Sequence, residues 1–353
     1  MADQEHLELL KQGTGVWNHW REQHADVHPN LYQAVLNKAN LREAALHHTN
    51  LQEGDLNHVD LCMADLRQSN LMGIRLKEAH LYTADLRGAN LQDSSLLGAD
   101  LREANLGSAD LQRANLSSSI LVMADLHDAN LREAVLQEAK LNYANLSYAD
   151  LSLADLQKCD FGRADLRGAH FYTANLKRSN LYCANLSHAD LREALLVEAN
   201  LRDADLREAN LNMAILSLAN LIGTTLYHAD LMFANLSMAN LCMANLSRAN
   251  LTGTTLIGTN FIGSNLYLAM MQDANLMEAD LREATLNEAD CNGANLQSAN
   301  FSMANLTYAN LQGANLQGAN LRQANLWNAN LKDANLEGVS FQGAVMPDGR
   351  VHS

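Results

Sequence analysis

Between Leu31 and Met346 an apolar residue occupies every fifth position of the chain, without one change of register. A period of five fits neither the period of about 3.6 residues of a helix face nor the strict alternation of a half-buried strand. A repeat this regular is typical of a solenoid, in which short units stack on their neighbours and bury a continuous core.

Each unit reads A(N/D)LXX, as in Ala104-Asn105-Leu106. In a few units other apolar residues replace the central Leu: Phe161, Phe171, Phe261, Met271, Cys291, Phe301, Phe341 and Met346. The position two residues earlier holds Ala or another small residue, so we expect both positions to point into a narrow interior. The other three positions carry most of the polar residues and are predicted to face water.

This pattern resembles the pentapeptide-repeat family, and the resemblance extends over about nine tenths of the chain. It implies an all-β fold, a right-handed quadrilateral parallel β-helix with four units per coil and one unit on each face. The chain would then contain about sixteen coils, with units twenty residues apart stacked on one face. The Trp-containing leader and the terminal run GAVMPDG are similar to cyanobacterial-type members of the family.

The sequence predicts three parts: an N-terminal helical cap at 1–28, the β-helix at 29–346 and a short C-terminal tail at 347–353. A cap is expected because an open stack exposes strand edges that invite aggregation. A helix that docks a partner is the alternative for this leader. At the other end, little covers the last coil, so its apolar residues are expected to be partly exposed.

The leader is expected to form two short amphipathic helices, interrupted near Gly13. Asp3 and Thr14 are the predicted N-cap residues, since both side chains can accept hydrogen bonds from free backbone N–H groups.

No segment approaches ~18 consecutive apolar residues, and no charged-then-apolar leader is present, so neither a transmembrane helix nor an export signal is predicted. The five cysteines are an odd number without metal-site spacing. By register Cys159 and Cys291 point into the core, and three point outward: Cys62, Cys183 and Cys242. These features favour a cytoplasmic location with reduced thiols.

The sequence contains no Gly-rich phosphate loop, no nucleophile-elbow serine and no HExxH motif. Carboxylates fall at solvent-facing repeat positions, so any aligned pair follows from the period alone. His24 and His28 are four residues apart, but Pro29 is expected to end a helix before they could share a face. We therefore predict no catalytic residue, no metal site, no cofactor and no enzymatic activity.

The formal net charge of −15 opposes direct nucleic-acid binding, because that affinity comes from Lys and Arg. The family resemblance brings in an alternative, since some members mimic DNA and occupy type II topoisomerases. Those relatives dimerise through a C-terminal module, and some carry loops between coils; this sequence has neither feature. Its acids also alternate with bases, as in Arg102-Glu103, which weakens the field that mimicry needs.

Charge nearly disappears between Leu211 and Met270, where only Asp230 and Arg248 are charged. Large apolar residues stand there at outward positions of the repeat. With two from the preceding coil they form the predicted protein interface, here called the apolar patch: Leu195, Val197, Met213, Ile215, Leu218, Met232, Phe233 and Met238. Three more extend it onto the next face: Ile222, Met243 and Ile262. Contiguous exposed apolar surface usually marks a protein interface, and apolar residues merely tolerated on a solenoid are the alternative.

We therefore predict a non-enzymatic protein-binding scaffold or regulator that presents a rigid β-helical surface to a protein partner. An acidic DNA mimic acting on a type II topoisomerase is the alternative. A homodimer through the middle coils or the C-terminal end is also compatible with the sequence. No residue pattern identifies the partner or the biological process.

Overall fold

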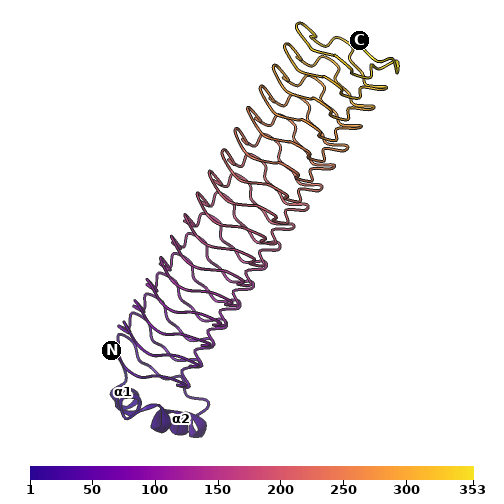
Figure 1. The fold of residues 1–353 in the computed structure, drawn as a ribbon. Helices are drawn as coiled ribbons and strands as arrows, with labels where there is room; N and C mark the ends of the chain where they lie inside the picture. The colour runs from indigo at the N-terminus through magenta and orange to yellow at the C-terminus, as the bar shows by residue number, and fades with distance from the viewer. The chain divides into compact units, whose positions relative to one another are not determined.

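The structure is a computed structural model that describes residues 1–353. It contains two compact units, Met1–Asn175 and Leu176–Ser353. Each unit is a stack of similar coils, and two helices lie at the N-terminal end of the first unit (Figure 1). Neither helix is long and apolar enough to cross a membrane.

Parallel β-bridges join residues twenty apart within each of the two compact units. They run from Asn30↔Asn50 to Asp155↔Asn175 in the first unit and from Asn180↔Asn200 to Asn325↔Val345 in the second. One residue in every five forms such a bridge, and it directly precedes the central apolar residue of its five-residue repeat. The predicted β-helix, with four five-residue units in each coil, is confirmed.

The interior consists of the Leu and Ala positions of nearly every five-residue repeat, and only in the first and last coils are some of these positions partly exposed, as at Leu336. Leu106 and Ala104 are both fully buried, and so are Phe161, Phe261 and Cys291, which replace Leu elsewhere. A fully buried Leu or Phe side chain stabilises the fold by about 1.5–3 kcal/mol relative to an exposed one. Within each compact unit, these ladders form a continuous core, as the period predicts.

Each corner of a coil is a β-turn that the residue pattern does not reveal. The Ala34 N–H donates a 2.9 Å hydrogen bond to the Leu31 carbonyl and closes a turn around Tyr32 and Gln33. Gln33 has φ 58°, and the equivalent residue of nearly every unit also has positive φ. Positive φ at this position is typical of a type II turn, which usually places Gly or Asn there. Most corners here carry a larger residue instead.

The Asn or Asp of each unit has a structural role beyond facing water. Oδ1 of Asn315 accepts from the Gln317 N–H at 3.2 Å and from Nδ2 of Asn335 at 3.0 Å. Its own Nδ2 donates to Oδ1 of Asn295 at 3.2 Å. The side chain therefore fixes the turn that follows it and joins three coils. Asp can replace the acceptor but cannot donate the second bond.

The first helix, α1, spans Gln4–Lys11, and the second, α2, spans Thr14–Gln23. The Asp3 carboxylate accepts hydrogen bonds from the first turn of α1, which confirms it as N-cap. The prediction for Thr14 is wrong by one residue, because Gly13 is the N-cap of α2. Gly13 has φ 112°, a conformation that other residues avoid, so the helix begins directly after it.

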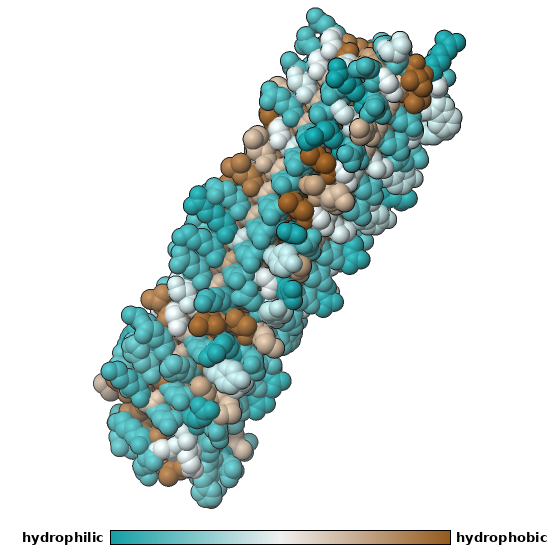
Figure 2. Space-filling view, in the orientation of Figure 1, coloured by the Kyte–Doolittle hydropathy of each residue, from teal (hydrophilic) through white to brown (hydrophobic).

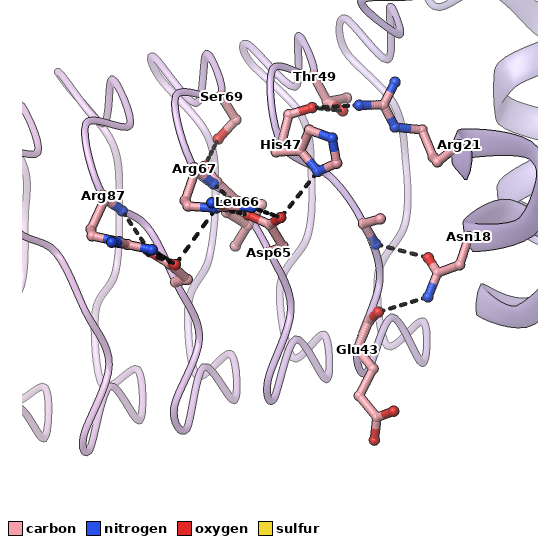
Figure 3. Close-up of polar contacts among 12 residues, drawn as sticks. Asn18, Arg21, Glu43, His47, Thr49, Asp65, Leu66, Arg67, Ser69 and Arg87 are labelled. Carbon is pink, nitrogen blue, oxygen red and sulfur yellow. Dashed lines mark hydrogen bonds and ion pairs between the residues drawn. The ribbon is translucent and has the colours of Figure 1, made fainter. Parts of the chain in front are cut away.

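Side chains of α2 replace the backbone groups that a preceding coil would supply. The Trp17 indole Nε1 donates to the Ala45 carbonyl at 2.9 Å. Asn18 donates to the Glu43 carbonyl and accepts from the Ala45 N–H, both at 2.8 Å, as Figure 3 shows. Trp17 is fully buried, so the same residues exclude water from the start of the core.

The α1 segment closes a second edge of the first coil, where the Asp3 N–H donates to the Asn30 carbonyl at 2.8 Å. At the C-terminus, Val351 bridges Val345 in antiparallel orientation. This short return covers part of the last coil, where Phe341 and Met346 are half-buried. Their partial exposure agrees with the prediction.

The cysteines follow the register with one exception. Cys159 and Cys291 are fully buried as predicted, and Cys183 and Cys242 are half-buried. Cys62 is buried rather than outward-pointing, with 8% of its surface exposed. It occupies the first turn position, where its N–H donates to Oδ1 of Asp60 at 3.0 Å, and other small residues at this position, such as Ser147 and Ser247, are also buried.

Candidate protein-binding surface

Four residues of the apolar patch occupy the second position of a corner turn. Met213, Leu218, Phe233 and Met238 have φ between 59° and 62°, and each is more than half exposed. This turn position points away from the coil, so long side chains there form ridges rather than core. The structure places all four in the second unit.

The other four patch residues are half-buried and lie between or beside these ridges. Leu195 and Ile215 bridge each other in parallel, so their side chains are neighbours on one face. The Met213 N–H donates to the Met232 carbonyl at 3.0 Å, which holds these two turns together. Val197 occupies the first position of a corner turn one coil before Leu218. The structure thus brings the eight predicted residues into adjacent positions on neighbouring coils.

Glycines twenty residues later make room for two of the four ridge side chains, and this pairing was missing from the predicted site. A Cβ atom placed on Gly253 would lie 2.6 Å from Cε1 of Phe233, and one on Gly258 would lie 2.6 Å from Sδ of Met238. Both side chains therefore lie flat over the glycine of the next coil. A glycine one coil after a bulky apolar corner residue is a sequence signal for Phe233 and Met238, whereas Met213 and Leu218 are followed by these two residues.

The middle of the patch carries little charge. Asp230 is one of the two charged residues between 211 and 270. Its Oδ1 accepts from the Met232 N–H and from Nδ2 of Asn250, both at 3.1 Å. That carboxylate is therefore hydrogen-bonded to its own turn and to the Asn of the next coil. The surface visible in Figure 2 is mainly hydrophilic, with apolar side chains in small groups.

A second cluster lies at one corner of the first unit, beside α2 (Figure 3). His47, His48, Arg67, Gln68 and Arg87 line an open pocket of about 330 Å³. Both guanidinium groups there are held by carboxylates of their own units, as in the 2.7 Å contact between Arg67 Nη2 and Asp65 Oδ2. Arg67 Nε also lies 3.6 Å from Oδ2 of Asp85 on the next coil, so the ion pairs of this cluster join the two coils.

Burial lowers the pKa of His47, and the nearby Arg21 cation lowers it further, although Asp65 at 3.1 Å opposes both. The lowered pKa favours the neutral form of the His47 imidazole. No group of three or more His, Cys, Asp or Glu side chains is arranged to hold a metal ion.

Comparisons with known proteins agree with the repeat geometry. A family model described as pentapeptide repeats matches the chain in segments that run from 30–68 to 309–346. HetL from the cyanobacterium Nostoc, a pentapeptide repeat protein involved in heterocyst differentiation regulation, is 36% identical over 62% of this chain and 91% of its own, with a TM-score of 0.35.

Two further solved structures show weaker matches. Rfr23, a pentapeptide repeat protein from the cyanobacterium Cyanothece, is 36% identical over 30% of this chain and 58% of its own, with a TM-score of 0.18. QnrB1, a plasmid-mediated fluoroquinolone resistance protein, is 19% identical over 57% of this chain and 87% of its own, with a TM-score of 0.20. A search of curated proteins found no match.

Proposed function

The chain belongs to the pentapeptide-repeat family, and on that premise we propose that it is a non-enzymatic scaffold or regulator that binds a protein partner through the apolar patch. The observation that carries this proposal is the exposure of four large apolar side chains on adjoining corners. Phe233 is 56% exposed and Met238 is 61% exposed, in a stretch with two charged residues. Burial of such a surface by a partner is favourable by roughly 25 cal/mol for each Å² of apolar area.

The composition of the patch supports a protein partner over a small ligand or a nucleic acid. Its side chains project from the corners, whereas small-molecule sites are usually concave. Met is flexible and polarisable, so it adapts to irregular apolar partner surfaces. No Lys belongs to the patch, and nucleic-acid affinity depends on cations.

The predicted alternative, DNA mimicry at a topoisomerase, gains less support from the charges. Several carboxylates form a bidentate ion pair with the arginine two residues later. In Arg102, Nε donates to Oδ1 of Asp100 at 2.8 Å and Nη2 donates to Oδ2 at 2.6 Å. A paired carboxylate contributes less to a long-range negative field than a free one. We therefore place protein binding through the patch first.

Affinity capture from native extract tests the proposal. The wild type is compared with Phe233→Asp/Leu218→Asp, which places two carboxylates on the ridges and leaves the Leu ladder intact. The matched control is Met303→Asp/Tyr308→Asp, because both residues are exposed at corner turns of the same unit but outside the patch. The proposal requires a protein retained by the wild type and the control but lost from the patch variant. Identical captures by all three would remove it.

Self-association remains a prediction that the same variants can address. Sedimentation equilibrium of the wild type gives the mass in solution. A dimer that the patch variant converts to a monomer would make a second copy of the chain the occupant of the patch. A wild-type monomer at all concentrations would exclude this occupant.

A further inference from the structure

The apolar ridges belong to two parallel columns of corner residues. Within a column, successive residues lie one coil apart. Five successive residues of the first column are Glu193, Met213, Phe233, Gly253 and Asp273. The second column repeats the order with Glu198, Leu218, Met238, Gly258 and Glu278. The face between the columns is continuous, because parallel bridges connect Leu195, Ile215, Asn235, Thr255 and Asn275.

Both columns change from apolar to acidic at the same levels. Glu193 and Glu198 precede the ridges, and Asp273 and Glu278 follow the two glycines. All four carboxylates are exposed. Neither Asp273 nor Glu278 lies within ion-pair distance of a cation, whereas Glu198 contacts Nε of Arg178 at 2.9 Å. The apolar strip is therefore closed at one end by two carboxylates without an ion-pair partner, Asp273 and Glu278, whereas at the other end the Glu198 carboxylate is shared with Arg178.

The spacing of the columns selects the conformation of an occupant. Successive coils are separated by ~4.8 Å, the distance between paired strands, so the acidic ends are about 19 Å apart. An α-helix repeats every ~5.4 Å and could place about one side chain over each coil. Side chains on one face of an extended strand repeat every ~6.7 Å, and this distance differs more from the coil spacing than the helix repeat does. A helix covers 19 Å with about 13 residues.

We propose that the strip between the two columns binds an amphipathic α-helix of a protein partner, with an apolar middle and Lys or Arg at the end that meets Asp273 and Glu278. Its apolar side chains would pack between the ridges formed by Met213 with Phe233 and by Leu218 with Met238. Its terminal cations would reach the carboxylates that close the strip. The inference rests on the proposed function and specifies which partner chemistry that surface selects.

Three labelled synthetic peptides of about 14 residues test the inference by fluorescence anisotropy. The first has an apolar helical face with two Lys residues at one end. The second replaces these Lys residues by Glu, and the third keeps the composition of the first but distributes its apolar residues around the helix. We expect the Lys-ended peptide to bind about ten-fold more tightly than the Glu-ended one at low ionic strength, with a smaller ratio at high salt.

Two variants assign this preference to the strip. Asp273→Asn/Glu278→Gln should reduce the ratio to about three-fold, whereas Glu283→Gln/Glu288→Gln, which removes the same charge at other exposed corners, should leave it unchanged. Phe233→Asp/Leu218→Asp should abolish binding of the Lys-ended peptide.

Three results would overturn the inference. They are equal binding of the Lys-ended and Glu-ended peptides, equal binding of the redistributed peptide, and no binding of any peptide. None of them removes the proposed function, which is decided by the capture experiment.

Discussion

The phenyl ring of Phe233 lies over Gly253, one coil later, so that a Cβ atom on the glycine would be 2.6 Å from ring atom Cε1. The exposed ridge is thus supported from below by backbone. Because the ring rests on a surface rather than projecting freely, its orientation is restricted before any partner arrives. A restricted side chain loses less entropy on binding.

Gly253→Ala should therefore destabilise the fold more than the same change at Gly313. Both glycines have φ +65°, so both substitutions carry the cost of about 1 kcal/mol for a side chain at positive φ. Only at Gly253 must the new methyl group displace a ring, because nothing lies within 4 Å of a Cβ on Gly313. Urea unfolding measures both variants. Equal losses would contradict the packing of Phe233, and Phe233→Ala should remove the difference between the two glycines.

Truncation of the cap residue Trp17 should loosen the first coil more than distant ones. Trp17→Ala removes a fully buried side chain and leaves the Ala45 carbonyl unpaired, for a cost of about 3–5 kcal/mol. Because coils of a solenoid contact only their neighbours, the loss should concentrate at the N-terminal end. Hydrogen exchange should accelerate in residues 30–50 and stay unchanged in residues 300–320. Val16→Ala, at an exposed position of the same helix, is the control and should alter neither region.

Substitution of Asn315 should separate the two functions of its side chain. Asn315→Asp keeps the acceptor for the Gln317 N–H but loses the donor to Asn295, so it should cost about 1 kcal/mol. Asn315→Ala loses these two interactions and also the bond accepted from Nδ2 of Asn335, and it should cost more. Unfolding midpoints that decrease from the wild type to the Asp variant and then to the Ala variant would support side-chain hydrogen bonds between coils. If Asp matched the wild type, the donated bond would contribute nothing.

Acid should weaken the pairing of Asp100 with Arg102. The hydrogen bonds from Arg102 lower the pKa of Asp100, despite the opposing effect of burial. A carboxylate whose pKa is depressed in the folded state stabilises the fold above its unfolded pKa of about 3.9, and the contribution disappears as pH falls through the folded value. Arg102→Gln should therefore lower stability at pH 7 and converge with the wild type near pH 2. Thermal unfolding across this range measures the difference, and parallel curves would argue against it.

The repeat and the location of the patch followed from the residue pattern because both depend on register alone. Once Leu106 and its equivalents fix the interior, the register assigns a direction to most other positions. Stacking at twenty residues then brings Met213 and Phe233 together without further information.

Features that depend on backbone conformation were not predictable in the same way. Turn residues with positive φ, such as Leu218, are of many types, so composition does not mark them. Cys62 and Thr14 were misplaced for a related reason, since each position depends on a local turn or cap rather than on the period. The glycine partners of the ridges appear only when residues one coil apart are compared.

The side chains of Trp17 and Asn18 form hydrogen bonds only with the first coil. The cap that closes the N-terminal end of the stack is therefore independent of the number of coils. No unit of the repeat carries information about how many coils precede or follow it. Insertion or deletion of twenty residues between Asn50 and Asn175 would leave the α2 contacts untouched and preserve the face of every remaining residue. The number of coils can therefore vary in whole steps during evolution while the cap that stops the stack stays the same.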